Sequence, residues 1–329
     1  MRHFLLAVGL LVAGCRPLYD TVDDGCVDHV PGEKKASAEA VDVFRRVTCY
    51  RRFERQAPAR VDDIVGQAAA SHARYFTING LPDNGDLLAE DPNAQGFTGR
   101  DPVERVEVRG FELAANESLG FWEGVFPNSP DLAPADLVDA LIPSPYTRQG
   151  VVQPDWRAGG FGTDGDYAVL TILYDFPAAT NVLRPVFWPR DGQTDVPTTW
   201  QVGYDDGIVP PDQPVGYPIT FTVGSDQQSS SLNNPNPYDL VLRDASVVDQ
   251  DGNTVHTWSI TPDNTSSPFL YSIGLVPQRP LAPNTTYTVS LRATWNAHDP
   301  ADFEASFTTG AAGRRSAALP VPLAQGWGR

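Results

Sequence analysis

The sequence predicts an α+β protein in which helices come first and strands dominate the second half. Stretches of helical period begin near residue 37, and a buried strand follows them before residue 177. After Leu183 no convincing helix occurs, and short strand-forming runs alternate with turns rich in Pro, Gly and Asn, a spacing typical of a β-sandwich. The chain of 329 residues is therefore expected to form two folded regions that meet near residues 178–184.

The N-terminus has the layout of an export signal. A basic start precedes the apolar run Phe4–Val12, which is too short to span a membrane because a spanning helix takes about 20 residues. Small residues follow, and the phrase Leu-Val-Ala-Gly-Cys that ends at Cys15 resembles the bacterial lipobox. The resemblance implies that residues 1–14 are a lipoprotein signal peptide and that Cys15 is lipidated; a plain signal peptide is the alternative. We therefore expect a lipoprotein of the bacterial cell envelope, anchored in the membrane and facing the periplasm or the exterior.

Two further cysteines, Cys26 and Cys49, remain after Cys15. An even remainder in an oxidising compartment predicts one disulfide, with two free thiols as the alternative. The three cysteines and five scattered histidines do not have the spacing of a zinc site, so no metal is expected from them.

The charge balance is acidic. The chain has 24 Lys and Arg residues against 41 Asp and Glu residues, which gives a formal net charge of −17. Nucleic-acid binding needs a basic face, and none is visible in the sequence. We therefore exclude DNA and RNA as partners.

The first region is expected to combine helices with a strand. Residues 15–36 are polar and aperiodic, which predicts a tether, and the folded region is expected to cover residues 37–177. Its alanine-rich second helix starts with aspartates that can cap it, and its third has Pro and Asp in the first turn. The expected helices are Ser37–Phe53, Asp62–Phe76 and Pro134–Leu141, and the expected buried strand is Tyr167–Tyr174. Arg51 and Arg52 are expected on the solvated face of the first helix.

The second region, residues 184–310, is expected to be a β-sandwich. Its candidate strands are short and separated by turns, of which Asp251-Gly252 is a hairpin turn. They are Val186–Trp188, Ile219–Val223, Asp239–Val248, Thr254–Ile260, Leu270–Leu275, Tyr287–Trp295 and Phe303–Thr308. Residues 311–329 are rich in Ala, Gly and Pro, and are predicted to be a disordered tail.

Several phrases of the first region resemble the CAP superfamily, also called the SCP or cysteine-rich secretory protein domain, in its bacterial form. They occur in the family's order and are Ser71–Phe76, Gly96–Gly99 with Arg105 and Gly110-Phe111, Ala115–Ser118, Ser144–Arg148 and Gly159–Gly162. The resemblance implies a three-layer α-β-α sandwich for this region.

The chain departs from that family at the residues that would bind a cation. Thr147 replaces the histidine of the Ser-Pro-x-His-Arg phrase, and the histidine expected before Gly96 is missing. Glu90 and Glu117 remain as candidate acids. Two carboxylates without imidazole would form at most a weak site for a divalent cation, so we expect no cofactor and no metal-dependent activity.

Five residues are candidates for the cleft that the resemblance implies: Glu90, Glu117, Thr147, Arg148 and His72. His72 is expected to pack between helix and sheet, with a role as ligand or base as the alternative. Arg148 is expected to anchor a loop rather than bind a substrate. Glu117 is either a cleft carboxylate or a solvated loop residue. Neither G-x-S-x-G nor H-E-x-x-H is present to indicate a nucleophile or a metalloprotease.

The second region resembles bacterial Ig-like domains. The phrases that carry the resemblance are Pro185–Pro197, Pro280–Val289 and Phe303–Gly310. It implies that Tyr287 forms a corner by bonding the backbone a few residues upstream. Such domains serve as spacers or adhesion modules, and the fold alone assigns no activity.

These observations together favour binding over catalysis. We expect a lipid-anchored CAP-domain protein that binds a lipid, a glycan or an envelope protein. One alternative is a hydrolase that uses an unrecognised site in the cleft, with Glu117 as its base. The other is a structural or adhesion lipoprotein that makes its contact through the Ig-like region.

Overall fold

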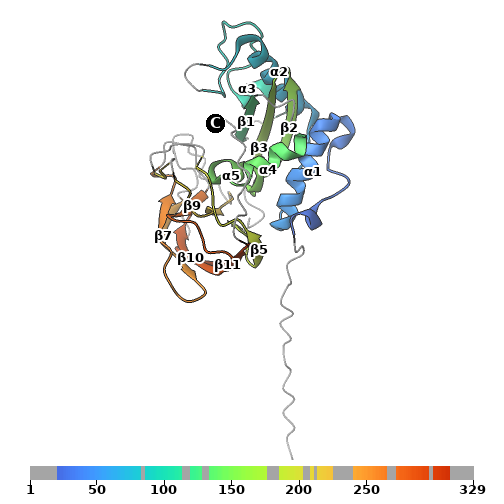
Figure 1. Ribbon diagram of the computed structural model, residues 1–329. Helices are drawn as coiled ribbons and strands as arrows, with labels where there is room; N and C mark the ends of the chain where they lie inside the picture. Colours follow the sequence, from blue (N-terminus) through green and yellow to red (C-terminus); the bar gives the residue numbers. More distant parts are fainter. Residues whose placement is uncertain are drawn as a thin grey trace, which may run out of the picture.

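The computed structural model places two regions side by side, one with helices around a sheet and one of strands (Figure 1). The residues that it describes are 21–82, 86–112, 119–127, 133–175, 185–202, 208–210, 213–224, 240–264, 272–295 and 299–311. Cys15, Glu117, the predicted signal peptide and residues 312–329 of the predicted tail lie outside them. The combination of helices with sheets whose strand pairs are antiparallel except for β5–β11 confirms the α+β class.

A three-stranded antiparallel sheet forms the centre of the first region. Its strands are β1 (Leu119–Pro127), β2 (Trp156–Asp164) and β3 (Tyr167–Asp175), in the order β1-β3-β2. β2 and β3 form a hairpin, and its turn contains Gly165 at φ 55°, a left-handed conformation that glycine adopts without strain. β3 pairs with both neighbours and is the central strand.

Polar side chains define where the helices of this region begin. The helices are α1 (Ala38–Phe53), α2 (Asp63–Asn79), α3 (Pro102–Glu107), α4 (Pro134–Leu141) and α5 (Pro145–Val152), preceded by 3₁₀ turns at Asp23–Gly25 and Glu33–Lys35. Ser37 Oγ accepts a hydrogen bond from the Ala40 amide at 3.1 Å, and the Asp62 carboxylate accepts one from the Ile64 amide at 3.0 Å. These caps satisfy amides that have no partner within the helix.

Helices cover both faces of the sheet, and glycines of β2 allow their close approach. A Cβ at Gly159 would lie 2.6 Å from the Phe44 ring of α1, whereas a Cβ at Gly160 would lie 2.1 Å from the Gly66 nitrogen of α2. Successive residues of a strand point to opposite faces, so α1 and α2 lie on opposite sides of the sheet. Trp122 of β1 lies in the same cross-strand row as Gly159 and packs against α5, which places α5 on the α1 side.

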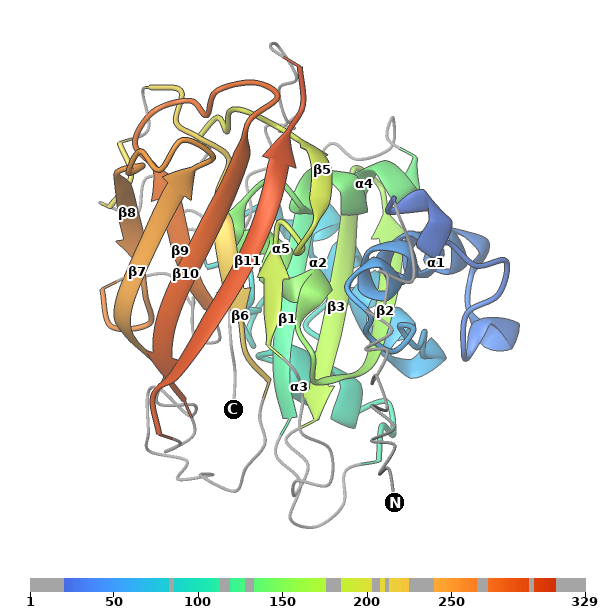
Figure 2. The ribbon, with the colours of Figure 1, turned by 90° about the horizontal axis from the view of Figure 1, so that it is seen from below.

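The second region contains two four-stranded sheets. One has the order β5-β11-β10-β7, with β5 (Gln193–Val196), β11 (Ala301–Thr309), β10 (Thr286–Thr294) and β7 (Val241–Asp249). The other has the order β4-β6-β9-β8, with β4 (Val186–Trp188), β6 (Ile219–Thr222), β9 (Ser272–Pro277) and β8 (Thr257–Ile260). The Phe221 ring of β6 lies 4.7 Å from the Phe303 ring of β11, so the sheets pack face to face (Figure 2).

Two local predictions in the second region agree with its geometry. The Tyr287 hydroxyl accepts a hydrogen bond from the Ala282 amide at 2.8 Å, five residues upstream. After β7, Gly252 adopts φ 82° in the turn, and the Asp249 carboxylate accepts hydrogen bonds from the amides of Asp251 and Asn253. Hydrogen bonds from Asn253 and Asp251 hold the pKa of Asp249 below its ordinary value. A tight hairpin therefore follows β7.

The two regions share a buried boundary between α5 and β6. The Arg148 guanidinium of α5 donates to the Pro218 carbonyl at 3.0 Å and to Thr220 Oγ1 at 3.2 Å. Gln153 follows α5 and donates to the Val223 carbonyl at 3.1 Å. One hydrophobic core continues from α1 into both sheets of the second region. The regions are therefore packed as one body in this structure.

The last turn of α1 makes the second set of contacts across this boundary. The Trp188 ring of β4 lies 5.7 Å from the Tyr50 ring and 5.9 Å from the Phe53 ring. Arg190 donates to the Phe53 carbonyl at 2.9 Å, and its guanidinium stacks 3.9 Å from the Phe53 ring. Nearby, Glu54 has a buried Oε1 without a hydrogen-bond partner among the described residues, and burial raises its pKa to about 8 against the effect of the Arg190 charge.

Three expectations differ from the structure. Arg51 is buried rather than solvated: it donates to the Ala57 carbonyl at 3.0 Å and to the Gln153 carbonyl at 2.6 Å, and burial lowers its pKa to about 9. Within the expected tether, Val30 is 4% exposed and belongs to the core, so the chain from residue 21 packs on α1. The strands and helices β1, β5, α3 and α5 were not among the expected elements.

Candidate functional site

Two of the five candidate residues, His72 and Glu90, meet inside the first region. His72 comes from the middle of α2, and Glu90 from the connection between α2 and α3. His72 Nδ1 lies 2.8 Å from Glu90 Oε1, and His72 Nε2 lies 2.9 Å from the Leu87 carbonyl oxygen. The side chain of His72 is 0% exposed, so the ring is buried as expected for a histidine packed between a helix and a sheet.

Two further ionisable residues complete this buried cluster. Arg105 of α3 donates from Nη2 to Glu123 Oε1 of β1 at 2.6 Å, and Glu123 Oε1 also lies 3.4 Å from His72 Nε2. Thr171 of β3 donates to Glu123 Oε2 at 2.5 Å. We call His72, Glu90, Arg105 and Glu123 the ionic cluster.

The charges of the ionic cluster balance when His72 is protonated. Both ring nitrogens of His72 face acceptors, a carboxylate and a carbonyl oxygen, so both contacts are hydrogen bonds only when the ring carries both protons. Two carboxylates then face one imidazolium and one guanidinium. A buried charge is tolerated when it is paired and hydrogen-bonded, which is the arrangement here.

Hydrogen bonds keep Glu90 ionised in spite of its burial. Burial alone would raise the pKa of Glu90, but hydrogen bonds from His72 and Thr98 and the charge of Arg105 outweigh it and hold the pKa below its ordinary value. Thr98 contributes its amide at 2.5 Å and its hydroxyl at 2.9 Å. The oxygens of Glu90 are thus occupied by protein donors.

Thr147 and Arg148 do not join the ionic cluster. Both are buried on α5, on the opposite side of the sheet. Thr147 Oγ1 donates to the Leu141 carbonyl, and Arg148 donates to the Ile142 carbonyl at 2.6 Å as well as across the boundary to the second region. Burial lowers the pKa of Arg148. Glu117 lies outside the described residues, so the five candidates do not form one cleft within the described part of the chain.

A cavity of about 240 Å³ opens elsewhere, where α1 and α2 begin. Its polar lining includes Glu39, Asp62 and Gln67, and Phe161 of β2 adds an aromatic wall. The Asp62 carboxylate caps α2 and lies within 3.9 Å of the Arg60 guanidinium. The cavity therefore presents carboxylates and small apolar side chains, and none of the residues of the ionic cluster lines it.

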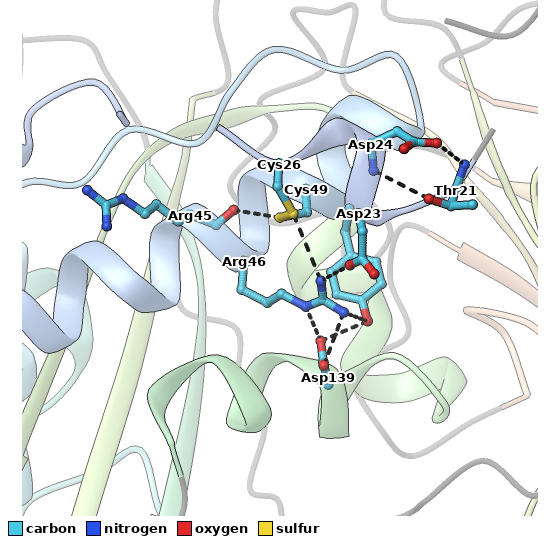
Figure 3. The surroundings of a disulfide bond; sticks show 9 residues. Thr21, Asp23, Asp24, Cys26, Arg45, Arg46, Cys49 and Asp139 are labelled. Atoms are coloured by element: carbon cyan, nitrogen blue, oxygen red, sulfur yellow. Dashed lines mark hydrogen bonds and ion pairs between the residues drawn. A yellow bond between two sulfur atoms is a disulfide. The ribbon is translucent and has the colours of Figure 1, made fainter. Parts of the chain in front are cut away.

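The predicted disulfide is confirmed. Cys26 and Cys49 are joined, and the bond ties the chain before α1 to the last turns of that helix (Figure 3). Arg46 lies beside it, with Nη1 4.0 Å from Cys26 Sγ and 2.6 Å from Asp23 Oδ1. Arg46 Nε also donates to Asp139 of α4, whose carboxylate accepts from the Tyr50 hydroxyl at 2.9 Å. Burial would lower the pKa of Arg46, but the hydrogen bonds from its guanidinium to Asp139 and Asp23 outweigh it and raise the pKa.

The described ranges contain no group of three or more His, Cys, Asp or Glu side chains placed to hold a metal ion. Within the same ranges, no helix combines the length and the apolar character needed to cross a bilayer. Neither finding extends to the remainder of the chain.

The comparisons with known proteins give little to identify this chain. No protein-family model and no curated protein matches the sequence. Among solved structures, a DUF4426 family protein from Pseudomonas aeruginosa is similar with a TM-score of 0.26 and 7% identity. That alignment covers 39% of this chain and 87% of the other.

The assignment to the CAP superfamily with a following Ig-like domain is therefore wrong. No family model, of this superfamily or of any other, matches the chain. The phrases that suggested it are short and rich in Gly, Ser and Pro, which turns and helix starts of many folds require. His72 and Arg148, which two of those phrases contain, have structural contacts that explain them without a family.

Proposed function

We propose that this protein is an exported lipoprotein of the cell envelope that acts by binding rather than by catalysis. The observation that carries the proposal is the ionic cluster: its members are at most 2% exposed, and its carboxylates are paired with His72 and Arg105. A general acid or base must reach substrate, and these groups do not. Their burial favours a structural role for the chemistry-bearing residues that the sequence singles out.

The compartment is supported by two independent features. The Cys26–Cys49 disulfide is typical of an oxidising environment, and disulfides are rare in the cytosol. The lipobox-like phrase ending at Cys15 provides the anchor, since its acyl chains would hold the protein on a membrane. The membrane partner and the envelope location rest on this phrase.

The cavity at the start of α1 and α2 is the place where we propose that ligand binds. Its volume of about 240 Å³ suits a sugar unit or a short side chain, and not an acyl chain. Its carboxylates, Glu39 and Asp62 among them, oppose anionic lipid head groups and favour hydroxyl or amine donors. Of the three ligand classes, a glycan of the envelope therefore fits better than a lipid.

Binding by the full-length oxidised protein tests this proposal. We would titrate it with soluble peptidoglycan fragments and, separately, with vesicles of anionic phospholipid. Gln67→Trp on α2 would fill the cavity and should weaken glycan binding about tenfold, which is about 1.4 kcal/mol. Arg74→Trp, exposed on the same helix and outside the cavity, is the matched control and should leave the affinity unchanged. Equal affinities for the two variants would contradict the cavity as the site.

Lipidation is tested separately. Wild-type protein expressed with its first 20 residues should fractionate with membranes and gain the mass of a lipid, and Cys15→Ser should do neither. Membrane association of Cys15→Ser equal to that of the wild type would refute the anchor.

A further inference from the structure

Between α2 and α3, residues 86–101 cross the ionic cluster and contain no helix or strand. We call these residues the strap. Within the described part of the chain, the strap's backbone hydrogen bonds are local turns, such as that from the Ala94 amide to the Asp91 carbonyl. What attaches it to α2, α3 and β1 is therefore contact with side chains.

The ionic cluster supplies most of the attachment. His72 Nε2 lies 2.9 Å from the Leu87 carbonyl oxygen. Arg105 Nη1 donates hydrogen bonds to the Leu88 carbonyl at 2.9 Å and to the Gly99 carbonyl at 3.3 Å. Gly99 is required for this fit, because a Cβ there would lie 2.8 Å from the Arg105 nitrogen. The strap's own Glu90 completes the attachment by bonding His72.

Two hydrogen bonds from α2 attach the strap outside the cluster. The Asp91 amide donates to the Tyr75 hydroxyl at 2.9 Å, and Asn79 donates to the Gln95 carbonyl at 2.8 Å. Neither bond involves a residue of the ionic cluster. They keep the strap close to α2, but they supply no hydrogen bond to the Leu87 carbonyl or to the Glu90 carboxylate.

We propose that the strap is a pH-released cover, held on α2 while the His72 ring carries both protons and freed when it loses one. A neutral ring can donate from one nitrogen only, so the other would point a lone pair at the Leu87 carbonyl or at the Glu90 carboxylate. At the same time two carboxylates would face Arg105 alone. The lost hydrogen bond and the lost positive charge both weaken the attachment of the strap.

The charged groups around His72 set the direction of this effect. Glu90 faces it from the strap, Glu123 from β1 and Arg105 from α3. Arg109, one turn beyond Arg105, donates to the Arg105 carbonyl at 2.7 Å, and burial lowers its pKa. Tyr75 stacks on the ring at 6.2 Å. Loss of a ring proton removes a cation from this set and leaves the carboxylates, so we expect release as the pH rises.

Release would uncover apolar surface. Leu87 is 6% exposed and packs in a cluster with Tyr75 and Phe76 of α2 and Val125 of β1. Lifting the strap exposes these side chains along the face of α2. The strap thus couples the charge of one buried histidine to the exposure of these apolar side chains.

Nuclear magnetic resonance on the full chain tests the proposal. The ring nitrogen shifts of His72 report its protonation, and hydrogen-exchange protection factors report the opening of amides 87–99, with the amides of β10 as the measure of global unfolding. We expect strap protection to fall at least tenfold with the same midpoint as the His72 shifts, while β10 stays protected. Strap protection that is constant through the titration of His72 would overturn the proposal. A ring that keeps both protons until β10 is lost would overturn it as well.

Two variants separate the cluster from its surroundings. Glu90→Gln keeps the size of the side chain and removes one charge that favours imidazolium, so release should move to lower pH. His29→Gln is the matched control, because His29 also bonds a glutamate, Glu33 Oε1 at 2.6 Å, but is 81% exposed and remote from the strap in sequence. Release at the same pH in wild type and Glu90→Gln would contradict the role of the cluster.

Discussion

Arg148 is a single side chain that joins two regions of the protein. Its guanidinium bonds carbonyls at the end of α4 and, across the boundary, the Pro218 carbonyl and Thr220 Oγ1 before and within β6. It also lies 5.1 Å from the Tyr217 ring. A buried arginine with only neutral acceptors in this contact set acts as a fixed cross-link between main-chain segments.

Replacing Arg148 should therefore destabilise the whole protein. Arg148→Met keeps much of the apolar stem but leaves the Ile142 and Pro218 carbonyls without this donor, and we expect a loss of about 3 kcal/mol in the free energy of unfolding. Urea unfolding measures it. Arg45→Met, which removes an exposed pair with Asp42, should change stability by about 0.5 kcal/mol or less. Similar losses in both variants would contradict the account.

Glu54 gives a pH dependence with a definite sign. Burial raises its folded-state pKa to about 8, above the usual 4.5, so the folded protein holds a proton that the unfolded chain releases. The stability contributed by the neutral carboxyl is present below pH 4.5 and is lost as the pH rises to about 8.

The Glu54→Gln variant isolates that contribution. The difference in the free energy of unfolding between wild type and Glu54→Gln should fall by about 2 kcal/mol from pH 5 to pH 8.5. This is less than the full difference in pKa implies, because Glu54 is half-buried and solvent screens its charge. Urea unfolding at several pH values checks this. A difference that is constant with pH, or that rises, would show that Arg190 and Arg148 keep Glu54 ionised.

The sequence identified some residues of the candidate site and missed others. His72 stood out as a histidine in an alanine-rich helix, and Glu90 was a candidate acid through the CAP resemblance alone; the structure brings the two together. Glu123 gave no signal, because a lone carboxylate in an apolar strand becomes meaningful only when Arg105 and Thr171 are known to face it. Contacts between residues that lie far apart in the sequence cannot be inferred from a local sequence pattern.

At the scale of elements, the glycines of β2 decide how closely α2 packs on the sheet. Gly160 leaves no room for a side chain, since a Cβ would lie 2.1 Å from the Gly66 nitrogen and 2.2 Å from the Val65 carbonyl carbon. A Cβ at Gly66 itself would be 3.6 Å from the Phe161 oxygen, an ordinary contact. Both positions lie at the interface between α2 and the sheet, but only position 66 has room for a methyl group.

Alanine at these two positions should have opposite effects on stability. Gly160→Ala forces α2 away from the sheet and should cost about 3 kcal/mol, whereas Gly66→Ala should stabilise by about 0.5–1 kcal/mol through the better helix propensity of alanine. Thermal and urea unfolding of both variants measure this. Destabilisation by Gly66→Ala as large as that by Gly160→Ala would show that the helix–sheet distance is not set by β2.

The helices α1 and α2 could be predicted from their apolar spacing and caps, and the buried strand β3 from its apolar run, whereas α5, β1 and β5 could not. α1 and α2 begin at their capping residues Ser37 and Asp62. In contrast, every residue of α5 is buried, so its sequence shows no polar face from which a helix could be inferred. β1 contains Gly120 and Gly124 and is buried from residue 120 to 126, which removes the alternation of a surface strand. β5 is short and polar at an edge.

At the scale of the whole molecule, the predicted boundary at residues 178–184 separates two regions of the sequence, but one hydrophobic core continues through both regions. One hydrophobic cluster includes Phe44 of α1, Trp188 of β4 and Leu291 of β10. The cross-boundary hydrogen bonds from Arg148, Gln153 and Arg190 satisfy main-chain carbonyls in the interior. Separation of the two regions would expose these apolar side chains and these hydrogen-bonded carbonyls to water.

We therefore expect the two regions to unfold together. Calorimetry of the full oxidised chain should give one transition whose calorimetric and van't Hoff enthalpies agree. Fluorescence and far-ultraviolet circular dichroism should report the same midpoint. Two resolved transitions would mean that each region is stable alone and that the shared contacts add little.

We propose that the ionic cluster stabilises the fold through the pairing of its buried charges. A double-mutant cycle on Arg105 and Glu123, followed by urea unfolding, measures this stabilisation, with Glu104→Gln, at a side chain 33% exposed, as the control on the same helix as Arg105. The account predicts that Glu123→Gln and Arg105→Met each lose about 3–5 kcal/mol, and that the double variant loses clearly less than their sum. Glu104→Gln should lose at most about 1 kcal/mol. Unchanged or increased stability of Glu123→Gln, the behaviour of a carboxylate held in place for catalysis, would contradict the claim.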